Sequence, residues 1–194
     1  YGKKLGVWSN ARPELIPPLE EMLEAQAATN PIWDLEGTKC FLVVSSNVTE
    51  EQNVVAVPIK KALRNGASLI VIDPRETELT RYATRWLRPV PGSETALIGG
   101  MLRVIVDESL GDHDFLGDRC EDVKLLRDSL WQFDLIKISA LTSIPQAEIQ
   151  EAARLLAASN PCASLYALET LEPEQRDSCV RAIINLALIT GNVG

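Results

Sequence analysis

Five polar residues in one short segment carry groups that could bind a nucleotide. Ser45, Ser46, Asn47, Thr49 and Glu50 follow an apolar run and precede a predicted helix. Hydroxyl, amide and free backbone N–H groups at this place suit phosphate or ribose oxygens, because the amino end of a helix has unpaired donors and a positive partial charge. The alternative is that Asn47 or Thr49 only caps the helix.

A second polar segment, Asp73-Pro74-Arg75, follows another apolar run. Its carboxylate can accept hydrogen bonds from ribose hydroxyls or from the N–H edge of a guanine, and its guanidinium can pair with a pyrophosphate. The alternative is a salt bridge between Asp73 and Arg75 that only stabilises a turn.

The third segment, Gly92-Ser93-Glu94, opens a further predicted helix. The Glu94 carboxylate could accept hydrogen bonds from guanine N1 and N2. The alternative is that Ser93 caps the helix and Glu94 lies in its first turn, where a negative charge is favourable.

The hydrophobic pattern places these segments on an α/β framework. Continuous apolar runs of strand length predict buried parallel strands, and apolar residues with helical spacing predict helices. Strands are expected at 40–44, 68–72, 86–90 and 162–166, and helices at 18–28, 53–64, 94–108, from 144 onward and at 173–189. Pro58 predicts a bend in the helix at 53–64 or a displaced start of that helix.

The order strand, helix, strand predicts βαβ units, whose strands end at the same edge of a parallel sheet. We therefore expect a three-layer αβα fold with a Rossmann-like, mostly parallel sheet flanked by helices. The expected division is a weakly patterned N-terminal segment with one helix (1–37) and a nucleotide-binding α/β domain (38–194) that is truncated at its C-terminus. Ligands of such folds bind beyond the carboxyl ends of the strands, where the three polar segments should meet.

Composition excludes several classes of function. The 194 residues carry a formal net charge of −8, which argues against a nucleic-acid binder. Apolar runs are far shorter than the roughly 20 residues of a membrane helix, so no direct membrane insertion is expected. Cys40, Cys120, Cys162 and Cys179 lack metal-ligand spacing, and His113 is the single histidine. We therefore nominate no metal ligand and no catalytic residue, and interpret Cys40 as part of the core.

No G-x-G-x-x-G motif follows the first predicted strand. The usual nicotinamide dinucleotide site is therefore not expected, because its glycines let the backbone approach the pyrophosphate. Side chains must do more of the binding here.

Five ordered motifs resemble the molybdopterin oxidoreductase family, which includes formate dehydrogenases, periplasmic nitrate reductases and dimethyl sulfoxide reductase. Among them are Ser46-Asn47-Val48-Thr49-Glu50 and Ile72-Asp73-Pro74-Arg75. Within the family, Thr49-Glu50 and Ile72-Asp73-Pro74-Arg75 are most similar to formate dehydrogenase alpha subunits. Together the motifs cover residues 28–36, 42–50, 64–78, 88–97 and 185–194.

The resemblance implies a fragment that binds one guanine dinucleotide arm of a bis-molybdopterin guanine dinucleotide cofactor with Mo or W. Residues matching 46–50 would lie along the nucleotide and phosphates, and those matching 73–75 and 92–94 would hold the guanosine. The family usually has Gly where Ser45 stands and Asp where Glu94 stands.

The resemblance also implies a parent enzyme that oxidises formate to CO2, with its metal-ligating residue and an iron–sulfur cluster outside this fragment. Expected partners are the rest of the parent chain and electron-transfer subunits, in the cytoplasm. The isolated fragment is expected to be inactive and to hold no cofactor. Two alternatives stay open: a large subunit of an NADH dehydrogenase complex that keeps the fold without the pterin, and a stand-alone nucleotide-binding module.

Overall fold

A five-stranded parallel sheet forms the centre of the computed structural model, which describes residues 7–9, 22, 31–112 and 128–192. The strands are β1 (Val7–Ser9), β2 (Cys40–Val44), β3 (Ser68–Ile72), β4 (Arg85–Leu87) and β5 (Cys162–Tyr166), in the order β1-β5-β2-β3-β4. The α/β architecture and the strands at 40–44, 68–72 and 162–166 are confirmed.

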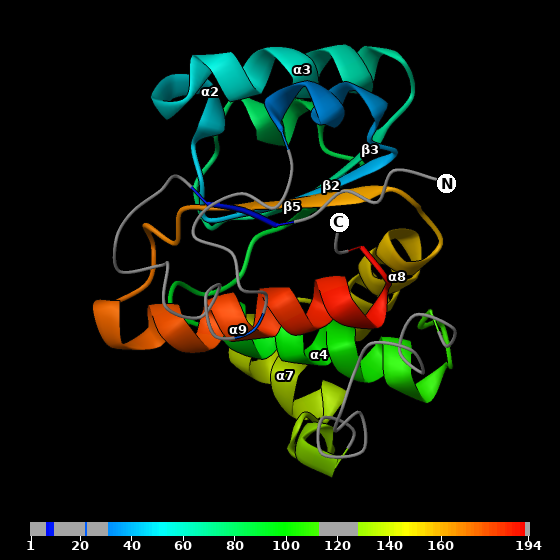
Figure 1. The fold of residues 1–194 in the computed structure, drawn as a ribbon. Helices are drawn as coiled ribbons and strands as arrows, with labels where there is room; N and C mark the ends of the chain where they lie inside the picture. Colours follow the sequence, from blue (N-terminus) through cyan, green and yellow to red (C-terminus); the bar gives the residue numbers. More distant parts are fainter. Residues whose placement is uncertain (1–6, 10–21, 23–30, 113–127, 193–194) are drawn as a thin grey trace.

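Helices cover both faces of the sheet (Figure 1). One face carries α2 (Val48–Glu51) and α3 (Asn53–Arg64), with the 3-10 helix η2 (Ile32–Gly37) packed against α3. The other face carries α4 (Glu94–Asp107), α7 (Leu135–Thr142), α8 (Gln146–Ala157) and α9 (Pro173–Ile189). Two further 3-10 helices, η3 (Leu79–Tyr82) and η4 (Leu130–Gln132), lie in the connections. The three-layer arrangement expected from the sequence is therefore confirmed.

Alternation along β2 explains why its run is apolar throughout. Phe41 and Val43 pack in the cluster that includes α3, whereas Cys40, Leu42 and Val44 pack in the cluster that includes α4, α8 and α9. All of these side chains are fully buried. Successive side chains of a strand point to opposite faces, so a strand covered on both faces needs apolar residues at every position.

Most of the predicted helix bounds also hold. The helix at 53–64 is continuous and contains the buried Pro58, so Pro58 does not displace its start. Gln52 separates it from the preceding short helix α2. The helices predicted at 94–108 and 173–189 are confirmed as α4 and α9. The helix predicted at 18–28 lies outside the described residues except for Met22, which packs against the core.

Two predictions at the sheet margins were inaccurate. The strand expected at 86–90 is β4, Arg85–Leu87, because Pro89 has no N–H for a ladder and the Val90 N–H donates to the carbonyl of Thr142 instead. β1 was not predicted at all, yet it pairs with β5 in parallel. Three residues are too short a run for strand periodicity to be detected.

The central strand makes a first prediction about stability. Leu42→Ala should lower the free energy of unfolding by about 3 kcal/mol, because Leu42 is fully buried and truncation leaves a cavity. Leu141→Ala is the matched control, since 58% of Leu141 is exposed, and should change the stability by less than about 0.5 kcal/mol. Urea denaturation measures both, and equal losses would contradict the assigned core.

Candidate nucleotide site at the carboxyl edge of the sheet

Parallel pairing brings the predicted polar segments to one edge of the sheet. Val44 at the end of β2 is the register partner of both Ile72 in β3 and Tyr166 in β5, and Ile72 also pairs with Leu87 in β4. The residues after these strands therefore emerge side by side. The order also reverses at β2, because β3 and β4 lie on one side of it and β5 and β1 on the other. A reversal of this kind opens a crevice for ligands in α/β sheets.

Ser45 and Glu94, from different segments, meet in a polar cluster with Thr170. The Thr170 hydroxyl oxygen lies 2.6 Å from Ser45 Oγ and 2.6 Å from Glu94 Oε1, and the Ser45 hydroxyl lies 3.4 Å from the same carboxylate oxygen. Ser45 and Glu94 are both fully buried. We call these three residues the Ser45–Thr170–Glu94 cluster. It joins the loops after β2 and β5 to the start of α4.

The second carboxylate oxygen of Glu94, Oε2, is buried and has no hydrogen-bond partner among the described residues. None of the salt bridges of the described part of the chain involves Glu94. A buried carboxylate oxygen without a donor is costly, so a ligand N–H group that reached Oε2 would gain a strong, charge-assisted hydrogen bond.

Asp73 and Arg75 form the turn salt bridge that was the alternative interpretation of their segment. Asp73 accepts from the Arg75 backbone N–H at 2.8 Å, from Nε at 3.0 Å and from Nη2 at 3.0 Å. The Asp73 side chain is fully buried, whereas 43% of Arg75 is exposed. Arg75 Nη1 also donates to Glu169 at 3.1 Å. The hydrogen bond with Asp73 is the main cause that raises the pKa of Arg75 above its ordinary value.

Asp73 is thus occupied in holding Arg75, and Arg75 lies between two carboxylates. The guanidinium presents hydrogen-bond donors and a planar face at the edge of the site, but its charge is already neutralised by Asp73 and Glu169. Pro74 contributes its carbonyl, which accepts from Arg88 Nε at 2.9 Å.

The first polar segment, residues 45–50, leads from the end of β2 into the short helix α2. Asn47 occupies the N-cap position without a side-chain capping bond, and its Oδ1 accepts from the Thr49 hydroxyl at 3.2 Å. Simple side-chain capping, the alternative for this segment, is therefore not what the structure has. Ser46 is buried and Glu50 is exposed. Among the described residues, no hydrogen bond uses the Asn47 amide N–H groups.

In the third segment, the Ser93 hydroxyl donates to the carbonyl of Val90 at 2.6 Å rather than capping α4. Gly92 has a φ of 87°, a left-handed conformation that a side chain would strain. The resulting tight turn directs Glu94 inward at the first position of α4.

Sequence reasoning missed the loop after β5, which connects the other segments. Glu169 contacts Arg75, and Thr170 contacts both Ser45 and Glu94. The predicted parallel strand at 162–166 was a signal that could have revealed this loop. A loop after any parallel strand reaches the same edge as the others.

The described cysteines are core residues, as was inferred for Cys40. Cys40, Cys162 and Cys179 are all buried and free. Burial raises the pKa of the Cys179 thiol to about 12, so it stays protonated at neutral pH. In the ranges 31–112 and 128–192, no group of three or more His, Cys, Asp and Glu could hold a metal ion. Cys120 and His113 lie outside the described residues.

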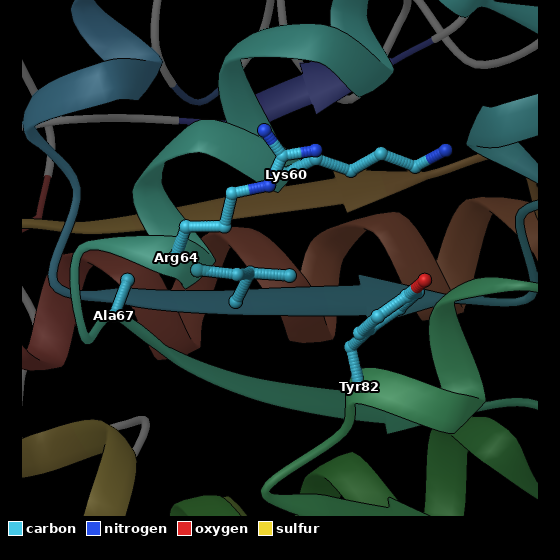
Figure 2. Close-up of a pocket in the computed structure, with 5 residues that line it drawn as sticks. Lys60, Arg64, Ala67 and Tyr82 are labelled. Carbon is cyan, nitrogen blue, oxygen red and sulfur yellow. The ribbon is translucent and has the colours of Figure 1, made fainter.

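A separate cavity lies between the C-terminal part of α3 and η3 (Figure 2). Its volume is about 280 Å³, and Lys60 and Arg64 of α3 line it together with Leu63, Ala67 and Tyr82. Ala67 directly precedes β3, and Tyr82 is the last residue of η3. Lys60 is paired with Glu78 at 2.7 Å. Glu78 belongs to the loop after β3 and also contacts Thr49, so this pair links the cavity to the first polar segment.

Comparison with known proteins identifies the family. The profile of the family described as molybdopterin oxidoreductase matches residues 15–194. The chain belongs to the molybdopterin oxidoreductase family. Its motifs and its fold therefore confirm the resemblance seen in the sequence.

Relatives of the chain have different activities. It is 34% identical over 176 residues to the formate dehydrogenase 2 subunit alpha of Methanococcus maripaludis, covering 91% of this chain and 26% of that protein. It is 33% identical to the assimilatory nitrate reductase catalytic subunit of Bacillus subtilis, covering 86% of this chain and 23% of that protein. The chain thus spans about a quarter of the length of these relatives.

A solved structure shows the same fold. Acetylene hydratase from Pelobacter acetylenicus superposes with a TM-score of 0.72 at 27% identity, over 84% of this chain and 24% of that one. No helix in the described residues of our chain is both long and apolar enough to cross a membrane.

Molybdopterin oxidoreductases use a molybdopterin cofactor with Mo or W, and the carboxyl edge has polar groups that could contact a cofactor of this kind. The orphaned Oε2 of Glu94 is an acceptor for an N–H group. Asn47 and the backbone at the start of α2 supply donors, as anionic oxygens require. The described residues at this edge therefore offer both a free acceptor and free donors to a polar ligand.

The buried salt bridge gives a second prediction. Asp73→Asn should lower the free energy of unfolding by about 2 kcal/mol, because it weakens the salt bridge with Arg75. This loss is smaller than for a fully buried pair, because Arg75 is half exposed and water screens its charge. Asp107→Asn is the matched control, since Asp107 pairs with Arg103 on the surface of α4 at 2.6 Å and should contribute less than about 0.5 kcal/mol. Chemical denaturation of the two variants decides, and an Asp73→Asn protein as stable as the control would contradict the assigned role.

Proposed function

We propose that this chain forms part of the site for one guanine dinucleotide arm of a bis-molybdopterin guanine dinucleotide cofactor. The observation that carries the proposal is the buried, unpartnered Oε2 of Glu94 at the carboxyl edge of the sheet. Guanine offers adjacent N1–H and N2–H donors. These donors match a carboxylate whose buried oxygen has no other hydrogen-bond donor among the described residues.

The other polar residues serve the rest of the dinucleotide in this proposal. Ser46, Asn47 and Thr49 lie at the start of α2 and contact the nucleotide and phosphate oxygens. Arg75 donates from its exposed guanidinium, while Asp73 fixes the orientation of that side chain through its hydrogen bonds. Because Asp73 and Glu169 neutralise Arg75, it contributes directed hydrogen bonds more than net charge.

We further propose that the parent enzyme is a formate dehydrogenase. Formate dehydrogenase alpha subunits of Methanococcus maripaludis and Methanocaldococcus jannaschii support this substrate, with 34% and 32% identity over most of the chain. The reaction converts formate into CO2, one proton and two electrons, and the metal–pterin group supplies the two-electron chemistry when bound. None of the described residues of this chain is assigned to the reacting atoms.

Within that enzyme, the chain's own residues bind and orient the nucleotide end of the cofactor. The iron–sulfur cluster, the metal-ligating residue and the electron-transfer subunits belong to other parts of the assembly. Two-electron oxidation at one centre requires an acceptor for electrons, which is why such subunits are part of the proposal.

A second function is favoured by a different observation. Ser45 has a φ of 44° and Leu168 a φ of 57°, conformations that favour glycine, and both residues are buried at the edge of the sheet. Glycine at such positions would let a ligand approach the backbone closely, whereas the side chains of Ser45 and Leu168 occupy that space. This favours a scaffold related to the large subunit of an NADH dehydrogenase complex, which keeps the fold without the pterin.

Analysis of the full-length protein distinguishes these functions. We expect Mo or W by mass spectrometry and GMP after acid hydrolysis of the bound cofactor. Glu94→Gln should lose most of the GMP, because it replaces a carboxylate oxygen by an N–H donor that faces the N–H edge of the base. Glu148→Gln, at an exposed site in the first turn of α8, is the matched control and should retain it.

Iron without Mo, W or pterin in the wild-type protein would contradict the cofactor-binding function and would favour the scaffold. Retention of GMP by Glu94→Gln, with the cofactor present in the wild type, would contradict only the role given to Glu94.

A further inference from the structure

The loop after β5 is held against Ser45 by backbone hydrogen bonds. The Ala167 N–H donates to the carbonyl of Val44 at 3.3 Å, and the Glu169 N–H donates to the carbonyl of Ser45 at 3.2 Å. The pairing of β5 with β2 thus continues beyond the last residues of both strands. As a result, the position of Thr170 is set by the sheet itself.

Two hydroxyls surround one oxygen of the Glu94 carboxylate. The Thr170 hydroxyl donates to Glu94 Oε1 over 2.6 Å. The Ser45 hydroxyl lies 2.6 Å from the Thr170 hydroxyl and 3.4 Å from the same Oε1. Hydroxyls in such a chain polarise one another, which strengthens the bond to the carboxylate.

We infer that Thr170 is a positioning residue for Glu94, and that it makes the site selective for a base with an amidine-like N–H edge. By holding Oε1, the Thr170 hydroxyl fixes the rotation of the carboxylate and leaves Oε2 as the acceptor for the ligand. This inference rests on the proposed function, because it presumes that the base binds at Glu94. It adds a residue and a source of selectivity that lie on the loop after β5.

The burial of the cluster supports this role. Glu94 and Ser45 are fully buried, and Glu94 takes part in none of the ion pairs of the described residues. Its orientation therefore depends on the hydroxyls of Thr170 and Ser45. The hydrogen bond also accounts for a serine at a φ of 44°, since the Ser45 side chain gains a partner that glycine would not have.

The test uses the full-length protein, produced in a host that cannot synthesise the pterin, and titrates it with GMP and IMP. IMP lacks the 2-amino group and so loses one N–H donor. Thr170→Val removes the hydroxyl at nearly constant volume and should weaken GMP binding by roughly tenfold, the equivalent of one hydrogen bond to a charged group. It should also reduce the preference for GMP over IMP, whereas Thr170→Ser should keep both.

Each outcome decides the inference. If Thr170→Val binds GMP as the wild type does, with the same preference over IMP, the positioning role is overturned while the proposed function stands. If the wild type binds neither nucleotide, the proposed function falls and the inference with it. Should Thr170→Val fail to fold, Ser45→Ala decides, because it removes the hydroxyl that contacts both Thr170 and Glu94 and should also reduce the preference for GMP. An unchanged preference in Ser45→Ala would overturn the inference.

Discussion

The structure depends above all on the parallel pairing of β5 with β2. This pairing places a strand from the C-terminal third of the chain beside the central strand, in the register Val44 with Tyr166. The loop after β5 consequently lies against Ser45, and the switch in strand order falls between these two strands. The loop after β5 adds to the direct contact between Ser45 and Glu94, because Thr170 contacts both residues and Glu169 contacts Arg75.

Two buried carboxylates at the edge have opposite electrostatic environments. Asp73 is compensated by Arg75, which donates to both of its oxygens. Glu94 has hydroxyl partners on one oxygen and none among the described residues on the other. A compensated carboxylate stabilises a turn, whereas an uncompensated one favours a ligand that brings its own donors. The difference explains why Glu94, rather than Asp73, is the centre of the proposed site.

Sequence patterns predicted the framework better than the site. The strands at 40–44 and 68–72 were recognisable because burial on both faces demands apolar residues at every position. The three polar segments were recognisable because they follow or precede such elements. Contacts between side chains of distant segments, such as Thr170 with Glu94, are set by strand order and loop conformation, which local patterns do not encode. The φ of 57° at Leu168, a residue that rarely takes this conformation, was equally unpredictable.

The central claim is that the carboxyl edge, and not the cavity at Lys60, Arg64 and Tyr82, binds the guanine nucleotide. Hydrogen–deuterium exchange of the full-length protein without its cofactor, with and without GMP, tests this most directly. The account predicts protection on adding GMP in residues 45–50, 92–95 and 167–171, with no change around Tyr82. Protection confined to the cavity, or none at the carboxyl edge under saturating GMP, would contradict it.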